Sequence, residues 1–132
     1  MAGIFEGGCL CGAVRYVAQG EPINVRVCHC RMCQKAIGAA FNARALFPLA
    51  AVTLSGPVGR ANSSPDLTRG FCPQCGATLF SERASIRAIG LSLGSLDEPD
   101  ALAPTDHIWI SSKQAWLKLD DGLPQHPQGP PP

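Results

Sequence analysis

The chain has 132 residues, with 11 lysines and arginines against 10 aspartates and glutamates, so it suits one domain without the basic excess of a nucleic-acid-binding surface. No run approaches the roughly 18 consecutive apolar residues of a membrane-spanning helix, and the N-terminus lacks the basic and apolar regions of a secretory signal. We therefore expect a cytoplasmic protein with neither nucleic acid nor membrane as partner, whose closely spaced cysteines bind metal rather than form disulfides.

Short apolar stretches separated by turn residues run along the chain, which contains 14 glycines and 12 prolines. They predict strands, in order, at 14–17, 23–27, 39–47, 52–54, 67–71, 77–81, 86–96 and 107–110. A short helix is expected at 31–37, ended by Gly38, and 97–100 could add one helical turn. The polar segment 60–66 is expected to be a loop, and 115–117 a packed anchor. The prediction is a mainly β fold of short antiparallel strands with one or two short helices.

One domain is expected over residues 3–124. From residue 125 onward the sequence is proline-rich and polar, and such segments rarely bury enough apolar surface to fold. We therefore predict a disordered tail at 125–132.

Seven cysteines form three groups along the chain: Cys9 and Cys11, then Cys28, Cys30 and Cys33, then Cys72 and Cys75. A disulfide framework would leave one thiol over, whereas two metal sites with four and three ligands use all seven. The first and last pairs are each followed by a glycine, and two such knuckles together make a closed four-thiolate zinc site. Alternatively Cys28 and Cys30 could join the last pair. We prefer the first division because it leaves no isolated pair.

The middle group, Cys28, Cys30 and Cys33, would form a three-cysteine cluster. In an extended chain Cys28 and Cys30 face one way and His29 the other, and a helix beginning after Cys30 returns Cys33 to the same point. Three ligands leave one position of a tetrahedral zinc open, as in catalytic sites. A histidine could instead close the site. Of the three histidines, His29 should face away and His126 lies in the predicted tail, which leaves His107 as the alternative fourth ligand.

Three thiolates on a divalent metal leave one net negative charge, which reduces Lewis acidity and raises the pKa of bound water. Such a metal suits a soft ligand, such as a substrate thiolate, better than it suits hydroxide formation. Arg31 and Lys35 are expected either to offset this charge or attract an anionic substrate, or to form an ordinary solvated helix face. A zinc deaminase would need a glutamate where the chain has Cys30, so that class is rejected.

Three motifs in this order, at 7–12, 28–33 and 69–76, resemble the glutathione-dependent formaldehyde-activating enzyme family, also called the CENP-V/GFA domain. The residues His107-Ile108-Trp109, Ser112-Lys113, Trp116 and Leu123-Pro124 resemble it as well. The resemblance implies a small, zinc-stapled β-tent-like domain with two Zn²⁺ per chain. By motif position it implies a structural zinc on Cys9, Cys11, Cys72 and Cys75, and a catalytic zinc on Cys28, Cys30 and Cys33.

The family's activity is carbon–sulfur lyase chemistry, in which formaldehyde and glutathione combine reversibly to S-hydroxymethylglutathione. We therefore hypothesise a zinc-dependent lyase that makes or breaks an S-hydroxymethyl thiol adduct, with a small thiol, such as glutathione, or its aldehyde adduct as partner. Asp66, His29 and His107 are the candidate acids or bases. The alternative is a non-catalytic zinc module that binds a protein or nucleic acid, and it predicts a side chain in the fourth metal position.

Overall fold

The computed structural model describes residues 3–129. The strands of the smaller sheet are β1 (Ile4–Gly8), β2 (Arg15–Gln19) and β5 (Val52–Ser55). Those of the larger sheet are β3 (Asn24–Cys28), β4 (Asn42–Pro48), β6 (Gly59–Ser64), β7 (Leu67–Phe71), β8 (Thr78–Arg83), β9 (Ala88–Ser92) and β10 (Asp106–Ile108). The α-helix is α1 (Arg31–Ile37), and short 3-10 turns lie at Leu49–Ala51, Ala84–Ile86, Leu93–Ser95 and Ile110–Ser112.

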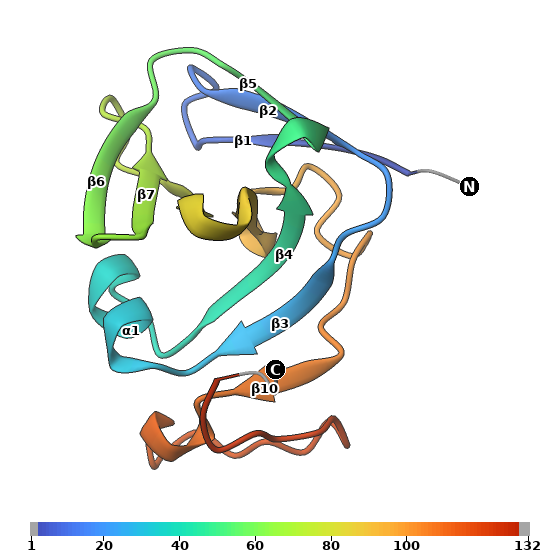
Figure 1. The fold of residues 1–132 in the computed structure, drawn as a ribbon, viewed down its shortest axis with the longest axis vertical. Helices are drawn as coiled ribbons and strands as arrows, with labels where there is room; N and C mark the ends of the chain where they lie inside the picture. The colour runs from blue at the N-terminus through green and yellow to red at the C-terminus, as the bar shows by residue number, and fades with distance from the viewer. Residues whose placement is uncertain (1–2, 130–132) are drawn as a thin grey trace.

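The smaller sheet has the order β1-β2-β5 and the larger sheet the order β10-β3-β4-β9-β8-β7-β6. Neighbouring strands are antiparallel, apart from the parallel pair β10 and β3. Figure 1 shows the smaller sheet across the top and α1 beneath the lower ends of β6 and β7. This arrangement confirms the predicted mainly β class.

The hydrophobic core is built from alternate residues of β2, β4 and β9, as expected for sheets with one buried face, and from the consecutive Leu79 and Phe80 of β8. Ala45 and Phe47 of β4 are fully buried, whereas Phe41 lies before the strand and is 37% exposed. Burying a side chain such as Phe47 contributes about 1.5–3 kcal/mol. The core therefore holds the smaller sheet against the centre of the larger one.

Several predicted elements agree with the structure and others are wrong. The helix has the predicted bounds, and Gly38 caps it in a left-handed conformation. The predicted loop at 60–66 is instead mostly strand β6, whose polar residues suit an exposed edge strand. The predicted strand at 86–96 is interrupted, because Arg87 takes a positive φ of 49° before β9 and a 3-10 turn follows it. Trp116, predicted as a packed anchor, is 65% exposed.

The predicted disorder from residue 125 is wrong for residues 125–129, and 130–132 lie outside the described residues. His126 N donates to His107 O at 2.9 Å, and Trp109 N donates to Gln128 O at 3.0 Å. Residues 124–128 cover the free edge of β10. Proline has no N–H to donate, but at this edge Pro124 O and Pro127 O act as hydrogen-bond acceptors. Proline content alone therefore gave the wrong expectation.

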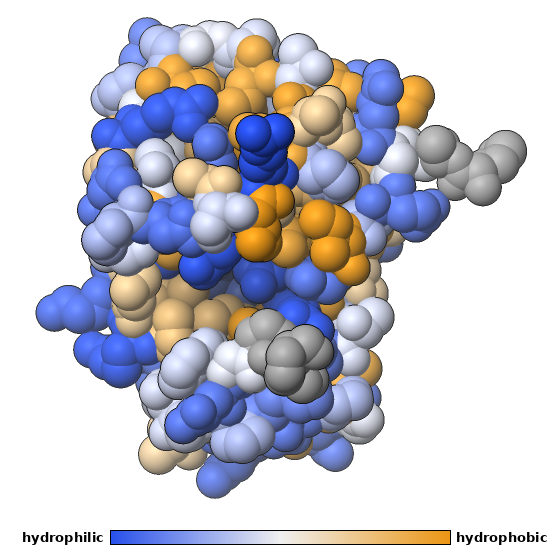
Figure 2. All heavy atoms as spheres, in the orientation of Figure 1, coloured by the Kyte–Doolittle hydropathy of each residue, from blue (hydrophilic) through white to orange (hydrophobic). Residues whose placement is uncertain are grey.

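The surface mixes residue types. Figure 2 shows hydrophilic and hydrophobic residues interspersed on the viewed face. Among the described residues, no helix combines the length and the apolar character needed to cross a membrane.

Candidate metal centres

The structure gathers the cysteines of the described chain into two clusters, and within each the Sγ atoms lie within 4.8 Å of one another. The four-cysteine cluster consists of Cys9, Cys11, Cys72 and Cys75, and the three-cysteine cluster of Cys28, Cys30 and Cys33. This is the division that ligand counting favours. Cys28 and Cys30 do not join the last pair.

The four-cysteine cluster joins the two sheets. One pair lies in the turn from β1 to β2, and the other between β7 and β8. Gly12 and Gly76, which follow the second cysteine of each pair, have φ values of 81° and 76°, a conformation that glycine adopts without steric cost. Each turn thereby folds its two thiols back toward the other pair.

The sulfur positions of this cluster fit a tetrahedral metal. Cys11 Sγ lies 3.6 Å from Cys9 Sγ and 3.7 Å from Cys72 Sγ. Four ligands at a zinc–sulfur distance of about 2.3 Å would be about 3.8 Å apart. The Val14 amide, 3.2 Å from Cys9 Sγ, lowers the pKa of that thiol to about 6, and the Ala77 amide lowers the pKa of Cys75. The backbone is thus arranged to stabilise thiolates before any metal arrives.

The three-cysteine cluster forms where β3 passes into α1. Cys28 ends the strand, and Cys30 is the helix N-cap, whose Sγ accepts a hydrogen bond from Cys33 N at 3.2 Å. This cap turns the chain so that Cys33 Sγ lies 3.6 Å from Cys28 Sγ. Cys28 and Cys33 are buried, while Cys30 is half-buried.

The donor chemistry of this cluster also fits a thiophilic metal such as zinc. Hydrogen bonds from Cys30 and Cys33 raise the pKa of Cys28, whereas those from Cys28 and Cys30 lower the pKa of Cys33. Cys33 is therefore the thiol that ionises more readily of the two. Three adjacent thiolates repel one another, so a divalent cation is the natural way to hold all of them deprotonated. Within residues 3–129, no histidine or carboxylate joins these three cysteines as a fourth donor.

The histidines that could have closed the site are engaged elsewhere. His29 Nε2 lies 2.9 Å from His107 Nδ1, and His107 Nε2 lies 2.7 Å from Asp121 Oδ2. His126 Nε2 lies 3.3 Å from Asp106 Oδ2. His29 therefore faces away from the cluster, as the alternation along the strand predicts. Asp66, another candidate acid or base, instead binds Ser85 in an exposed turn.

Hydrogen bonds around His29 tie the loop that carries Cys28 and Cys30 to the C-terminal segment. The Asp121 carboxylate accepts a hydrogen bond from His107 Nε2, so His107 Nδ1 accepts one from His29 Nε2. This leaves His29 Nδ1 buried without a partner among the described residues. Burial lowers the pKa of His29, so its imidazole stays neutral. Gln34 Nε2 bridges His29 O at 2.7 Å and Ser112 O at 3.0 Å.

Arg69 is a cation that contacts the three-cysteine cluster, and sequence reasoning did not identify it as such. Its Nη2 lies 3.6 Å from Cys33 Sγ, and its side chain is buried. Arg31 and Lys35, the cations named from the sequence, are exposed on α1, where Arg31 donates to Gln34 Oε1. Arg69 stands in one of the three motifs of the family resemblance, which was the only signal for it.

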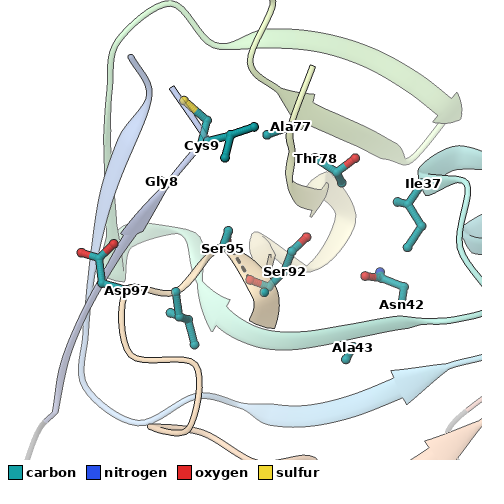
Figure 3. Close-up of a pocket in the computed structure, with 13 residues that line it drawn as sticks. Gly8, Cys9, Ile37, Asn42, Ala43, Ala77, Thr78, Ser92, Ser95 and Asp97 are labelled. Atoms are coloured by element: carbon teal, nitrogen blue, oxygen red, sulfur yellow. Dashed lines mark hydrogen bonds between the residues drawn. The ribbon is translucent and has the colours of Figure 1, made fainter. Parts of the chain in front are cut away.

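A cavity of about 630 Å³ extends from the four-cysteine cluster toward the elements that carry the other cluster. Cys9 lies at one end and Asn42 at the other, as Figure 3 shows. Asn42 is the β4 residue that pairs with Cys28, and Ile37 of α1 also lines the cavity. The polar side chains of Asn42, Thr78 and Ser92 are drawn around it in Figure 3. The lining residues include no lysine or arginine, and Asp97 is paired with Arg15.

The sequence matches the model of the family described as glutathione-dependent formaldehyde-activating enzyme over residues 4–112. A curated relative from Schizosaccharomyces pombe, described as an uncharacterized lyase, is 34% identical over 76 residues, or 58% of this chain. The matched region spans 56% of that relative, so the chain covers little more than half of the relative's length.

The fold is also similar to that of a solved structure. A crystal structure of a Rhodobacter sphaeroides protein superimposes with a TM-score of 0.58 at 22% sequence identity, covering 75% of this chain and 91% of that one. At this identity the likeness concerns the fold. The family match spans most of the chain, and the chain belongs to the glutathione-dependent formaldehyde-activating enzyme family.

Proposed function

We propose that this protein is a zinc-dependent carbon–sulfur lyase that makes or breaks the S-hydroxymethyl adduct of a small thiol at the three-cysteine cluster. Family membership and the lyase description of the Schizosaccharomyces pombe relative support the reaction class. The observation that carries the proposal is a set of three converging Sγ atoms with no fourth protein donor in residues 3–129.

The reaction needs little from the protein beyond binding and orientation. In the direction of synthesis, a thiol sulfur bonds to the formaldehyde carbon, the carbonyl π bond opens, and the thiol proton ends on the new hydroxyl oxygen. Zinc, when bound by Cys28, Cys30 and Cys33, supplies a Lewis acid with one position for an external sulfur or oxygen ligand. Holding two reactants in place lowers the entropic barrier to their union.

Two hollows that α1 helps to line are the candidate places for the body of the thiol. The cavity beside Asn42 falls within the usual size range of small-molecule sites. Its lining has no lysine or arginine and its Asp97 is paired with Arg15, so it suits neutral hydrogen-bonding groups. Arg31, Lys35, Gln114 and Trp116 help to line a second hollow of about 380 Å³. A carboxylate-bearing thiol such as glutathione finds complementary charge there.

The alternative of a non-catalytic zinc module requires a side chain in the fourth position of the three-cysteine cluster. His29 and His107 bind each other, and His126 binds Asp106. The geometry therefore favours the enzyme.

The test is exchange of ¹³C-formaldehyde between its free and thiol-bound forms, followed by NMR on the zinc-loaded protein with glutathione and with 2-mercaptoethanol. The wild type should accelerate exchange for at least one thiol, and Cys30→Ser should not. Fully metal-loaded wild-type protein that accelerates neither exchange contradicts the proposal.

A further inference from the structure

Arg69 is a buried cation without a carboxylate partner. Its side chain is 9% exposed, and none of the ion pairs in residues 3–129 includes it. Its hydrogen bonds are from Nε to Ser63 Oγ at 3.1 Å and from Nη2 to Cys33 Sγ at 3.6 Å. A buried charge is costly unless it is paired, so the sulfur cluster is the partner that accounts for this arginine.

The curvature of the larger sheet brings Arg69 to this position. β7 lies four places from β3 in the strand order, yet α1 lies beneath the ends of β6 and β7 in Figure 1. The guanidinium thus approaches Cys33 from a strand that lies far in the sheet order from β3, which ends at Cys28. It also has N–H groups beyond the two that bind Ser63 and Cys33, since guanidinium carries five donors.

A second arginine, Arg44 of β4, lies on a strand that adjoins the cluster. Its Nη1 donates to Asn24 Oδ1 at 2.9 Å, and it stands opposite Arg26, which pairs with Asp106. No ion pair in the described chain includes Arg44. Burial lowers its pKa, and charge on Cys28 and Cys33 opposes that change.

Charge counting shows what these cations imply. Three thiolates with one divalent cation carry one net negative charge, and Arg69 cancels it. Arg44 adds positive charge nearby, so the surroundings tolerate a further anion rather than repel it. Without such cations, a neutral fourth ligand would be favoured over an anionic one.

We propose that Arg69 is a specificity-determining residue of the three-cysteine centre, which pairs with Cys33 and makes the open position selective for an anionic sulfur ligand, an external thiolate, over a neutral one. This inference rests on the proposed thiol chemistry of the same site, but it concerns ligand binding and requires no turnover. The guanidinium supplies both the compensating charge and hydrogen-bond donors, as arginine commonly does at anion sites.

The experiment uses the full chain loaded with Co²⁺, whose absorption spectrum reports each ligand change. A closed four-thiolate site has no position for an added ligand, so spectral changes on titration report on the three-cysteine cluster. Two probes are compared, 2-mercaptoethanol as the thiolate and imidazole as the neutral ligand. Arg69→Gln removes the charge and keeps hydrogen-bond donors, Arg69→Lys keeps the charge, and Arg60→Met is the control from the same hairpin, where Arg60 forms an exposed pair with Glu82.

Arg69→Gln should bind 2-mercaptoethanol about 10- to 100-fold more weakly, the usual effect of losing a group that supports a metal ligand, while its imidazole affinity stays close to that of the wild type. Arg69→Lys should keep most of the thiol preference, and Arg60→Met all of it. Equal losses for both probes, or no loss for either, overturn the proposal. If Arg69→Gln does not fold, Arg69→Met takes its place and is judged by the same results: a selective loss of thiol affinity supports the proposal, and equal losses or no loss overturn it. Selective thiolate binding without formaldehyde exchange would contradict only the lyase.

Discussion

His107 Nδ1 lies 2.9 Å from His29 Nε2, and this bond connects the C-terminal segment with the residue between Cys28 and Cys30. The two histidines were candidates for metal ligation or acid–base chemistry from the sequence. In the structure they form a buried chain that ends at Asp121. The geometry of the loop that carries Cys28 and Cys30 therefore depends on residues far later in the sequence.

Asp121→Asn should lower the free energy of unfolding, and the loss should be the same at every pH between about 8 and about 5.5. The bond from His107 holds the pKa of Asp121 below its usual value, so its stabilising effect is full above the unfolded-state pKa of about 4 and is lost as the pH falls through the lower folded-state value. Urea midpoints of zinc-loaded protein measure this, with exposed Asp120→Asn as the control. If the difference in urea midpoint between the wild type and Asp121→Asn disappears between pH 7 and 6, the titration of a histidine and not of this carboxylate controls the stabilisation.

Cys75→Ser and Cys30→Ser should behave differently. Loss of a structural zinc removes about 10–16 kcal/mol of binding energy, more than the net stability of most domains, so Cys75→Ser should unfold. Cys30→Ser should remain folded and hold about one zinc per chain against about two in the wild type. Metal analysis and circular dichroism measure both. If the two variants are equally unstable, the three-cysteine cluster is structural.

A chain that ends at Pro124 should be less stable than one that ends at Gly129. The shorter chain loses four backbone hydrogen bonds between residues 126–128 and residues 107–111. At a net value of about 0.5–1.5 kcal/mol each, their loss costs about 2–6 kcal/mol. Denaturant unfolding of the two zinc-loaded chains gives the difference. Equal stability of the two chains would instead support the disordered tail that the proline content predicts.

Gly70→Ala should destabilise the protein, whereas Gly94→Ala should not. A Cβ on Gly70 would lie 2.1 Å from Phe80 Cζ, in the core, while a Cβ on Gly94 meets nothing within 4 Å. Overpacking of this kind typically costs about 1–3 kcal/mol, and an open surface site less than about 0.5 kcal/mol. Thermal unfolding of both variants is the measurement, and similar melting temperatures would refute the predicted contrast.

Features with local causes were predictable from the sequence. The bounds of α1 follow from Gly38, and the β7–β8 hairpin follows from the cysteine pair and glycine between its strands. The grouping of the cysteines follows from counting ligands. Each of these depends on residues only a few positions apart.

Features that depend on the curved sheet were not predictable in the same way. Arg69 meets Cys33 only because β7 is carried around to α1, and no periodicity in either segment indicates that contact. Strand β6 was missed because an edge strand exposed to water needs no apolar alternation. The pairing of 125–128 with β10 was missed because those residues use backbone groups rather than apolar side chains.

The two clusters also differ in how far apart their donors lie along the chain. Cys28 and Cys33 are five positions apart, whereas Cys11 and Cys72, whose sulfurs are 3.7 Å apart, are separated by 61. Closing a short loop costs little entropy, so the central thiols can gather a metal ion while the chain is still unfolded. The other four meet only once both sheets are in place. Metal uptake should therefore occur in two kinetic phases, an early one that is independent of folding and a late one that coincides with the last folding step.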